Sequence, residues 1–101
     1  MIVATVMYPP SARFDVDYYM NKHMPLVRAR CEGGGLVGTQ VLKGEAGPDG
    51  AAPPYQVVTL LSFASLAEFQ STMQQHGAEL LGDVPNFTDS QPAIQVNTAL
   101  G

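Results

Sequence analysis

The chain has 101 residues, of which 46% are hydrophobic and 14% are charged, and its formal net charge is -4. This length is enough for one hydrophobic core, so we expect one domain over residues 1–101, and the low charge favours an oligomer. The five Lys and Arg residues form no run that could follow a phosphate backbone, which argues against a nucleic-acid partner.

The same composition argues against a membrane protein. The apolar stretches are far shorter than the roughly 20 residues that span a bilayer. Cys31 is the only cysteine, so no intrachain disulfide can form, which is typical of a reducing compartment. We therefore expect a cytoplasmic protein without membrane contact.

The first predicted strand covers residues 2–8, an apolar run that ends at two prolines. Asp15 can cap a following helix, on which Val16, Tyr19, Met20 and His23 recur at a spacing that places them on one inward face. Tyr18 would project to nearly the opposite side. Pro25 should bend this helix, which then restarts and runs to about Cys31.

A glycine run leads into the second predicted strand, residues 36–43. Residues 44–54 are rich in Gly, Ala and Pro and describe a solvated hairpin connection. The third strand, residues 55–63, is the clearest, with neither of its faces polar.

Ser65 and Glu68 have the form of a capping box, so the second helix should begin at about Leu66. Gly77 is placed to end it, and residues 78–81 add at most one further turn. A loop over residues 83–87 leads to the last strand, at roughly 91–98.

The predicted order βαββαβ is that of the α+β ferredoxin-like fold, in which a four-stranded antiparallel sheet carries both helices on one face. On the first and third strands both sets of alternating side chains are apolar, so both faces of the sheet require burial. A second sheet packed on the open face is the simplest cover. We therefore expect a homodimer that encloses a barrel between its subunits.

Two segments resemble a known family. Residues 14–27, which read Phe-Asp-Val-Asp-Tyr-Tyr-Met-Asn-Lys-His-Met-Pro-Leu-Val, resemble the signature of the EthD family in the dimeric α+β barrel superfamily, and residues 83–89 with Pro92 and Gln95 resemble its C-terminal pattern. The resemblance implies a ferredoxin-like homodimer. The family is named for a role in ethyl tert-butyl ether degradation, and most members have no assigned reaction. Related families include polyketide cyclases, lactone isomerases, cofactor-free monooxygenases and haem enzymes.

His23 is the residue best suited to proton transfer, because the reference pKa of an imidazole, about 6.5, lets it take and give a proton near neutral pH. Tyr19 lies one helical turn earlier, and its hydroxyl could stabilise an enolate or phenolate oxygen. Both residues also have structural interpretations. The histidine could bond a carbonyl freed by the bend at Pro25, and the tyrosine could belong to the core.

A substrate cleft is expected where the first helix, the sheet and the loop before the last strand converge. Tyr8, Phe87 and Asp89 are its predicted substrate-binding residues, and its apolar lining suits a hydrophobic or aromatic small molecule. Asp83 and Asp89 could instead be solvated turn or helix-end acids, and His76 is expected to interact with the helix dipole and solvent.

The sequence predicts no metal site and no cofactor. His23 and His76 lie far apart with no metal-ligand spacing around them, and the glycine run precedes a strand, whereas a phosphate-binding loop precedes a helix. Haem ligation by His23 is an alternative, because the related families include haem enzymes, but no residue of this sequence favours it.

Three functions remain open at this point. The first is a cofactor-free cyclase, isomerase or lyase that acts on a small hydrophobic carbonyl compound through His23. The second is a non-catalytic protein that binds a hydrophobic metabolite beside a degradation or oxygenase system. The third is a cofactor-free monooxygenase, for which no residue is diagnostic.

Overall fold

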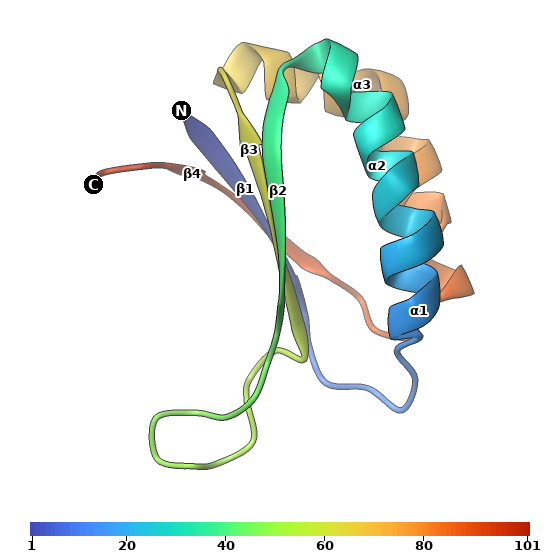
Figure 1. Cartoon of the computed structure of the whole chain (residues 1–101), viewed down its shortest axis with the longest axis vertical. Coiled ribbons are helices and arrows are strands. Elements are labelled where there is room, and N and C mark those ends of the chain that lie inside the picture. The colour runs from blue at the N-terminus through green and yellow to red at the C-terminus, as the bar shows by residue number, and fades with distance from the viewer.

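The computed structural model describes all 101 residues and has the element order βαββαβ (Figure 1). The strands form one antiparallel sheet in the order β2-β3-β1-β4. Both helical layers lie on the same side of this sheet (Figure 1), so the predicted ferredoxin-like fold is confirmed. The strands are β1 (Ile2–Tyr8), β2 (Leu36–Lys43), β3 (Val57–Phe63) and β4 (Ala93–Thr98).

The first helical layer is continuous and contains one wide turn. It consists of α1 (Val16–Tyr18), the π-helical turn η1 (Tyr19–His23) and α2 (Met24–Cys31), followed by the short 3₁₀ turn η2 (Glu32–Gly34). Asp15 caps it as predicted, because its Oδ1 accepts the Tyr18 N–H at 3.0 Å.

Pro25 lies in the first turn of α2 as predicted, and the turn before it, where we expected a bend, is π-helical. The N–H of Met24 donates to the carbonyl of Tyr19, five residues earlier, so the turn before the proline is wider than an α-helical turn. A wider turn relieves the clash between a proline ring and the carbonyl one turn back.

The π turn also changes which residues face inward, and here the sequence-based prediction is partly wrong. Val16 and Met20 are 50% and 40% exposed, whereas Tyr19 and His23 are buried. The extra residue in the turn rotates the helix beyond it, so the buried stripe continues through Met24 and the residues that follow.

The second helix, α3 (Leu66–Gly82), begins where predicted. The Ser65 hydroxyl accepts the Glu68 N–H at 3.2 Å and donates to the Glu68 carboxylate at 3.0 Å. The expected end at Gly77 is wrong, but the further turn allowed for residues 78–81 exists, and it continues the same helix to Gly82. A glycine inside a helix costs only about 1 kcal/mol, which packing of the helix on the sheet can offset. The short turn η3 (Val84–Asn86) follows.

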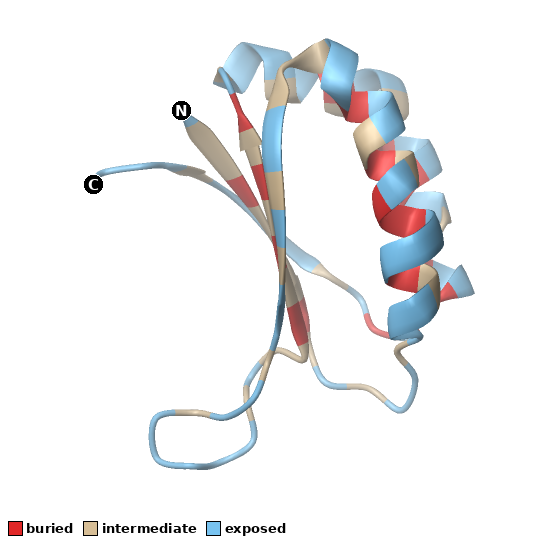
Figure 2. Ribbon diagram, in the orientation of Figure 1, coloured by how far each residue is buried: buried red, intermediate tan, exposed pale blue.

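Burial is concentrated where the helices meet the sheet (Figure 2). On β1 and β3 the helix-facing side chains are the buried ones, including Ala4, Tyr8, Leu61 and Phe63. The alternate side chains on the far face, such as Val58, are only half-buried. None of the helices has the length and apolar character needed to cross a bilayer.

The open face of the sheet is therefore an apolar surface without a cover in a single chain. Val58 lies on this face near one end of the interior strand β3, paired with Met7 on one side and Leu42 on the other. The sequence left open which set of strand side chains would face away from the helices. Because Val6 and Thr59 line the cavity beneath the helices, it is the alternate set, which contains Thr5 and Val58.

We expect the substitution Val58→Glu to convert a dimer into a monomer, because it would bury a charge between two sheets. Light scattering after size exclusion at micromolar concentration measures the mass. The control is Gln75→Glu, which adds the same charge on the exposed side of α3 and should leave the mass unchanged. A monomeric mass for the wild-type chain would contradict the prediction.

Candidate active site

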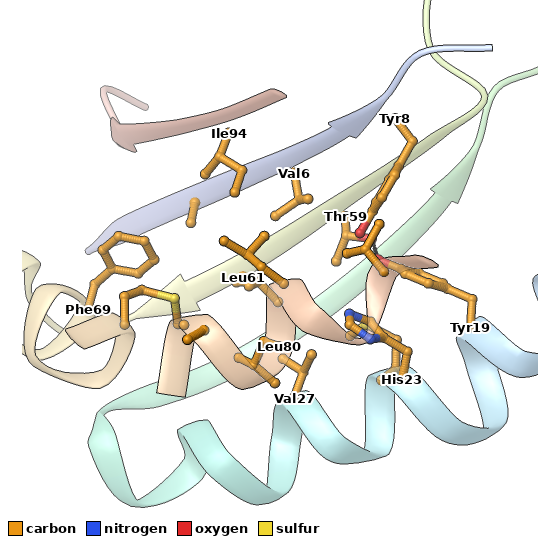
Figure 3. Close-up of a pocket in the computed structure, with 17 residues that line it drawn as sticks. Val6, Tyr8, Tyr19, His23, Val27, Thr59, Leu61, Phe69, Leu80 and Ile94 are labelled. Atoms are coloured by element: carbon orange, nitrogen blue, oxygen red, sulfur yellow. Dashed lines mark hydrogen bonds between the residues drawn. The ribbon is translucent and has the colours of Figure 1, made fainter. Parts of the chain in front are cut away.

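A cavity of about 430 Å³ lies between the sheet and the two helical layers (Figure 3). Seventeen residues from β1, β3, β4, the first helical layer, α3 and η3 line it, and 14 of them are hydrophobic. Figure 3 shows Tyr8, Tyr19, Thr59 and His23 together at one end, while Phe69 lies at the other. The cavity thus has one polar end and one apolar end.

His23 is held at the polar end by a carboxylate. It is 5% exposed, and its Nδ1 lies 2.9 Å from the Asp83 Oδ2. The other ring nitrogen, Nε2, has no hydrogen-bond partner in the protein. Every fully buried side-chain nitrogen and oxygen does have a partner, so Nε2 is not fully buried. Because His23 lines the cavity, Nε2 is the ring nitrogen that a bound molecule can reach.

Asp83 accepts hydrogen bonds from three side chains. Besides His23, the Tyr18 hydroxyl donates to its Oδ1 at 2.7 Å and the Asn86 amide donates at 2.9 Å. Burial raises the pKa of Asp83, but the hydrogen bonds from Asn86, His23 and Tyr18 outweigh it and hold the pKa below the usual range.

An ionised Asp83 fixes the tautomer of the neutral imidazole. The carboxylate can only accept, so Nδ1 of His23 must carry the proton and Nε2 must carry the lone pair. This is the arrangement in which a histidine acts as a general base toward the cavity.

Asp83 and Tyr18 are therefore corrections to the sequence-based interpretation. The sequence indicates that Asp83 could be a solvated turn or helix-end acid, but its side chain is only 14% exposed and is bonded to His23. Tyr18 was expected to point away from the site, but its hydroxyl reaches the same carboxylate and its ring lies 6.2 Å from that of Phe87.

Two tyrosine hydroxyls and one threonine hydroxyl complete the polar end. The Tyr19 hydroxyl hydrogen-bonds the Thr59 hydroxyl, and the Tyr19 ring is stacked on the imidazole of His23 with 5.2 Å between centroids. Burial raises the pKa of Tyr19, and burial together with the neighbouring Tyr19 raises the pKa of Tyr8. Both phenols therefore stay protonated near neutral pH and can donate to a ligand oxygen.

Phe87 supports the site from outside the cavity lining. It is fully buried, and its ring centroid lies 4.7 Å from that of His23 and 4.9 Å from that of Tyr19. Asp89 is exposed, accepts the Arg13 N–H at 3.3 Å and does not line this cavity. Of the predicted substrate-binding residues, the cavity lining thus includes Tyr8 alone.

The structure thus brings three predicted residues together: Tyr8, Tyr19 and His23. Thr59 was missed, although a signal existed, because it is the one hydroxyl in the otherwise apolar inward stripe of β3. Asp83 carried no comparable local signal, since it meets His23 across 60 residues of chain. No group of three or more His, Cys, Asp or Glu side chains is placed to hold a metal ion.

Comparison with known proteins gives a specific similarity at the level of solved structures. The chain is 40% identical to an EthD-like protein from Ralstonia eutropha JMP134, covering 99% of this chain and 92% of that one with a TM-score of 0.90. No family model and no curated protein matches the chain.

More distant structures share the fold. A dimeric ferredoxin-like protein of unknown function from Jannaschia sp. CCS1 is 17% identical, with a TM-score of 0.62 over 97% of this chain and 98% of that one. SnoaB, a cofactor-independent oxygenase from Streptomyces nogalater, is 13% identical, with a TM-score of 0.67 over 99% and 92%. At this identity the two similarities establish the fold alone.

The low pKa of Asp83 predicts how stability depends on pH. The folded-state pKa lies below the unfolded value of about 3.9, so the stabilisation by Asp83 is complete above that value and is lost as pH falls through the folded pKa. Asp83→Asn should lower the free energy of unfolding at pH 7 by about 1–3 kcal/mol. Urea unfolding at several pH values measures this difference, which should shrink below about pH 4.

The control for this prediction is Asp49→Asn, which changes an exposed loop carboxylate whose acceptor role toward Ala51 an amide can retain. It should leave the free energy of unfolding nearly constant at every pH. A loss for Asp83→Asn that is equally large at pH 3 and pH 7 would show that the carboxylate charge is not what stabilises the fold.

Proposed function

This chain belongs to the EthD-like proteins, and we propose that it is a cofactor-independent enzyme in which His23 transfers a proton on a small hydrophobic carbonyl compound. The observation that carries the proposal is the orientation of the imidazole. Asp83 occupies Nδ1 of His23 at 2.9 Å, so the basic Nε2 remains for a molecule in the cavity. A purely structural histidine would gain nothing from an unpartnered nitrogen at a cavity wall.

The proposed step is the breaking of a C–H bond beside a carbonyl. Nε2 takes the proton, and the electron pair of that bond stays with the substrate as an enolate, so no electrons enter or leave the site. Where the carbonyl compound has a neighbouring C=C bond, the enolate extends over it as a dienolate, and return of the proton from the imidazolium to the far carbon gives an isomer with the double bond shifted. Asp83 would stabilise the imidazolium formed in between, because its carboxylate is ionised and already bonded to Nδ1.

The hydroxyls of Tyr8 and Tyr19 would stabilise the enolate oxygen. Both are buried at the same end of the cavity as His23, and their raised pKa values keep them as donors. A donor that is already oriented in a water-poor site stabilises developing negative charge more than bulk water does.

Reaction with dioxygen would begin with the same deprotonation. SnoaB is described as a cofactor-independent oxygenase, but its 13% identity supports a shared fold and not a shared reaction. No residue of this chain favours an oxygenase over an isomerase, cyclase or lyase. An oxygen electrode during turnover separates these chemistries directly.

The second candidate function is non-catalytic binding of a hydrophobic metabolite. The observation in its favour is the composition of the lining, in which 14 of 17 residues are hydrophobic. Such a wall suffices to hold an apolar molecule. In that case the bond between His23 and Asp83 would serve only to orient the ligand and join the two helical layers.

Proton transfer can be tested without knowing the natural substrate. With 4-phenylbutan-2-one as the probe in D2O, proton NMR follows exchange of the hydrogens beside the carbonyl. We expect the wild-type chain to accelerate exchange and His23→Ala to lower that rate by about 10²–10⁴-fold, because the general base is lost. Binding of the probe should persist, since the apolar wall is intact.

The matched control is His76→Ala, which removes the other histidine of the chain, on α3 and outside the cavity lining. It should exchange the probe at the wild-type rate. If the wild-type chain and His23→Ala bind the probe equally and neither accelerates exchange, the binding function is correct and the enzyme proposal fails.

A further inference from the structure

The interior of α3 contains a glycine that neither packing nor backbone geometry requires. Gly77 is buried and lines the cavity, five residues before the helix ends. Its φ is not positive, so an alanine would adopt the same conformation without strain. Alanine is also the better helix former, which makes a glycine here a cost to the fold.

Space for a side chain exists at this position. A Cβ built on Gly77 would meet a single heavy atom within 4 Å, the Met73 Cβ at 3.9 Å, which is an ordinary van der Waals contact. Gly34 is a contrast, because a Cβ there would collide with the Thr72 side chain. Since Gly77 is buried and lines the cavity, the open space in front of it is the cavity itself.

Gly77 lies between the two ends of the cavity. Along α3 the lining runs from Phe69 and Met73 past Gly77 to Leu80, and the 11 residue steps from Phe69 to Leu80 correspond to about 16 Å of helix. The polar groups are gathered at the His23 end, and Phe69 lies at the opposite end (Figure 3). A molecule that reaches from one end to the other must pass Gly77.

We propose that Gly77 determines ligand length. The absent side chain lets an elongated ligand place one oxygen-bearing head at His23 and the tyrosine hydroxyls and extend an unbranched apolar tail past α3 toward Phe69. This inference rests on the proposed function, since it requires that the cavity binds a small molecule.

The chemistry of the wall defines the ligand class. Apart from the tyrosine hydroxyls, the polar side chains in the lining are His23 and Thr59, and both lie at the head end. A polar group in the tail would find no hydrogen-bond partner beyond Gly77 and would pay the full cost of desolvation. The ligand is therefore a phenol, enol or ketone with a single polar head and a hydrocarbon tail.

A pair of phenols that differ in tail length tests this proposal. Dissociation constants of 4-methylphenol and 4-octylphenol are measured by displacement of N-phenyl-1-naphthylamine fluorescence from the full-length chain. For Gly77→Ala we expect binding of 4-octylphenol to weaken at least tenfold, because the new methyl group occupies the path of the tail. Binding of 4-methylphenol should change less than twofold.

The matched control is Gly82→Ala, the same substitution at the exposed end of α3, where a Cβ meets nothing within 4 Å. It should bind both phenols as the wild-type chain does. Gly77→Ser is a second variant with a side chain of similar size. Thermal melting checks folding, and Gly77→Ala should melt at or above the wild-type temperature.

The outcomes separate the two proposals. In one outcome the wild-type chain binds both phenols, and the Gly77→Ala and Gly77→Ser variants bind both with unchanged affinity or with affinities lowered equally. The length-determining role is then wrong, while the binding cavity stands. If the wild-type chain binds neither phenol nor the fluorescent probe, the ligand cavity of the proposed function is wrong and this inference falls with it.

Discussion

The hydrogen bond between His23 and Asp83 joins the two helical layers at the point where the cavity becomes polar. His23 is the last residue of the π turn of the first helical layer, and Asp83 is the C-cap residue that directly follows α3. Each has further support, since Asp83 also accepts from Tyr18 and Asn86, and the His23 ring packs on Tyr19 and Phe87. The bond therefore depends on the positions of both helices.

The π turn contains both residues of the first helical layer that carry polar side chains into the cavity, Tyr19 and His23. In a regular α-helix Val16 and Met20 would share the inward face with Tyr19 and His23, yet the structure exposes the first two. The wide turn places Tyr19 against the Thr59 hydroxyl and His23 against Asp83 at the same time. Pro25, two residues after the turn, makes a regular α-helical turn at this point unfavourable, because its ring would meet a carbonyl of the preceding turn.

Local signals in the sequence were sufficient for the fold. The apolar runs, the prolines after β1, and the caps at Asp15 and Ser65 predict the element order, and the EthD resemblance is confirmed by a 40% identical structure. The errors arose where a tertiary contact decided the outcome. Gly77 did not end α3, which continues for another turn to Gly82 and its C-cap at Asp83.

The candidate site was only half predictable for a related reason. Tyr8, Tyr19 and His23 lie in elements whose inward faces can be recognised from spacing, so their convergence in the cavity could be anticipated. Asp83 and Tyr18 take part through one carboxylate that reaches its partners across 60 and 65 residues of chain. Neither periodicity nor capping encodes such a contact, and only the assembled structure reveals it.

Both the cavity-lining face and the open face of the sheet depend on the register in which the strands pair. On β1, Ala4, Val6 and Tyr8 line the cavity, while the alternate positions form the open face. A slip of one residue would exchange the two sets, removing the Tyr8 hydroxyl from His23 and placing a bulky ring on the open face. The antiparallel pairing of Tyr8 with Val57 and of Val6 with Thr59 holds this register. The polar end of the cavity therefore exists only because β1 and β3 pair in one way, and a partner sheet on the open face would stabilise that same pairing.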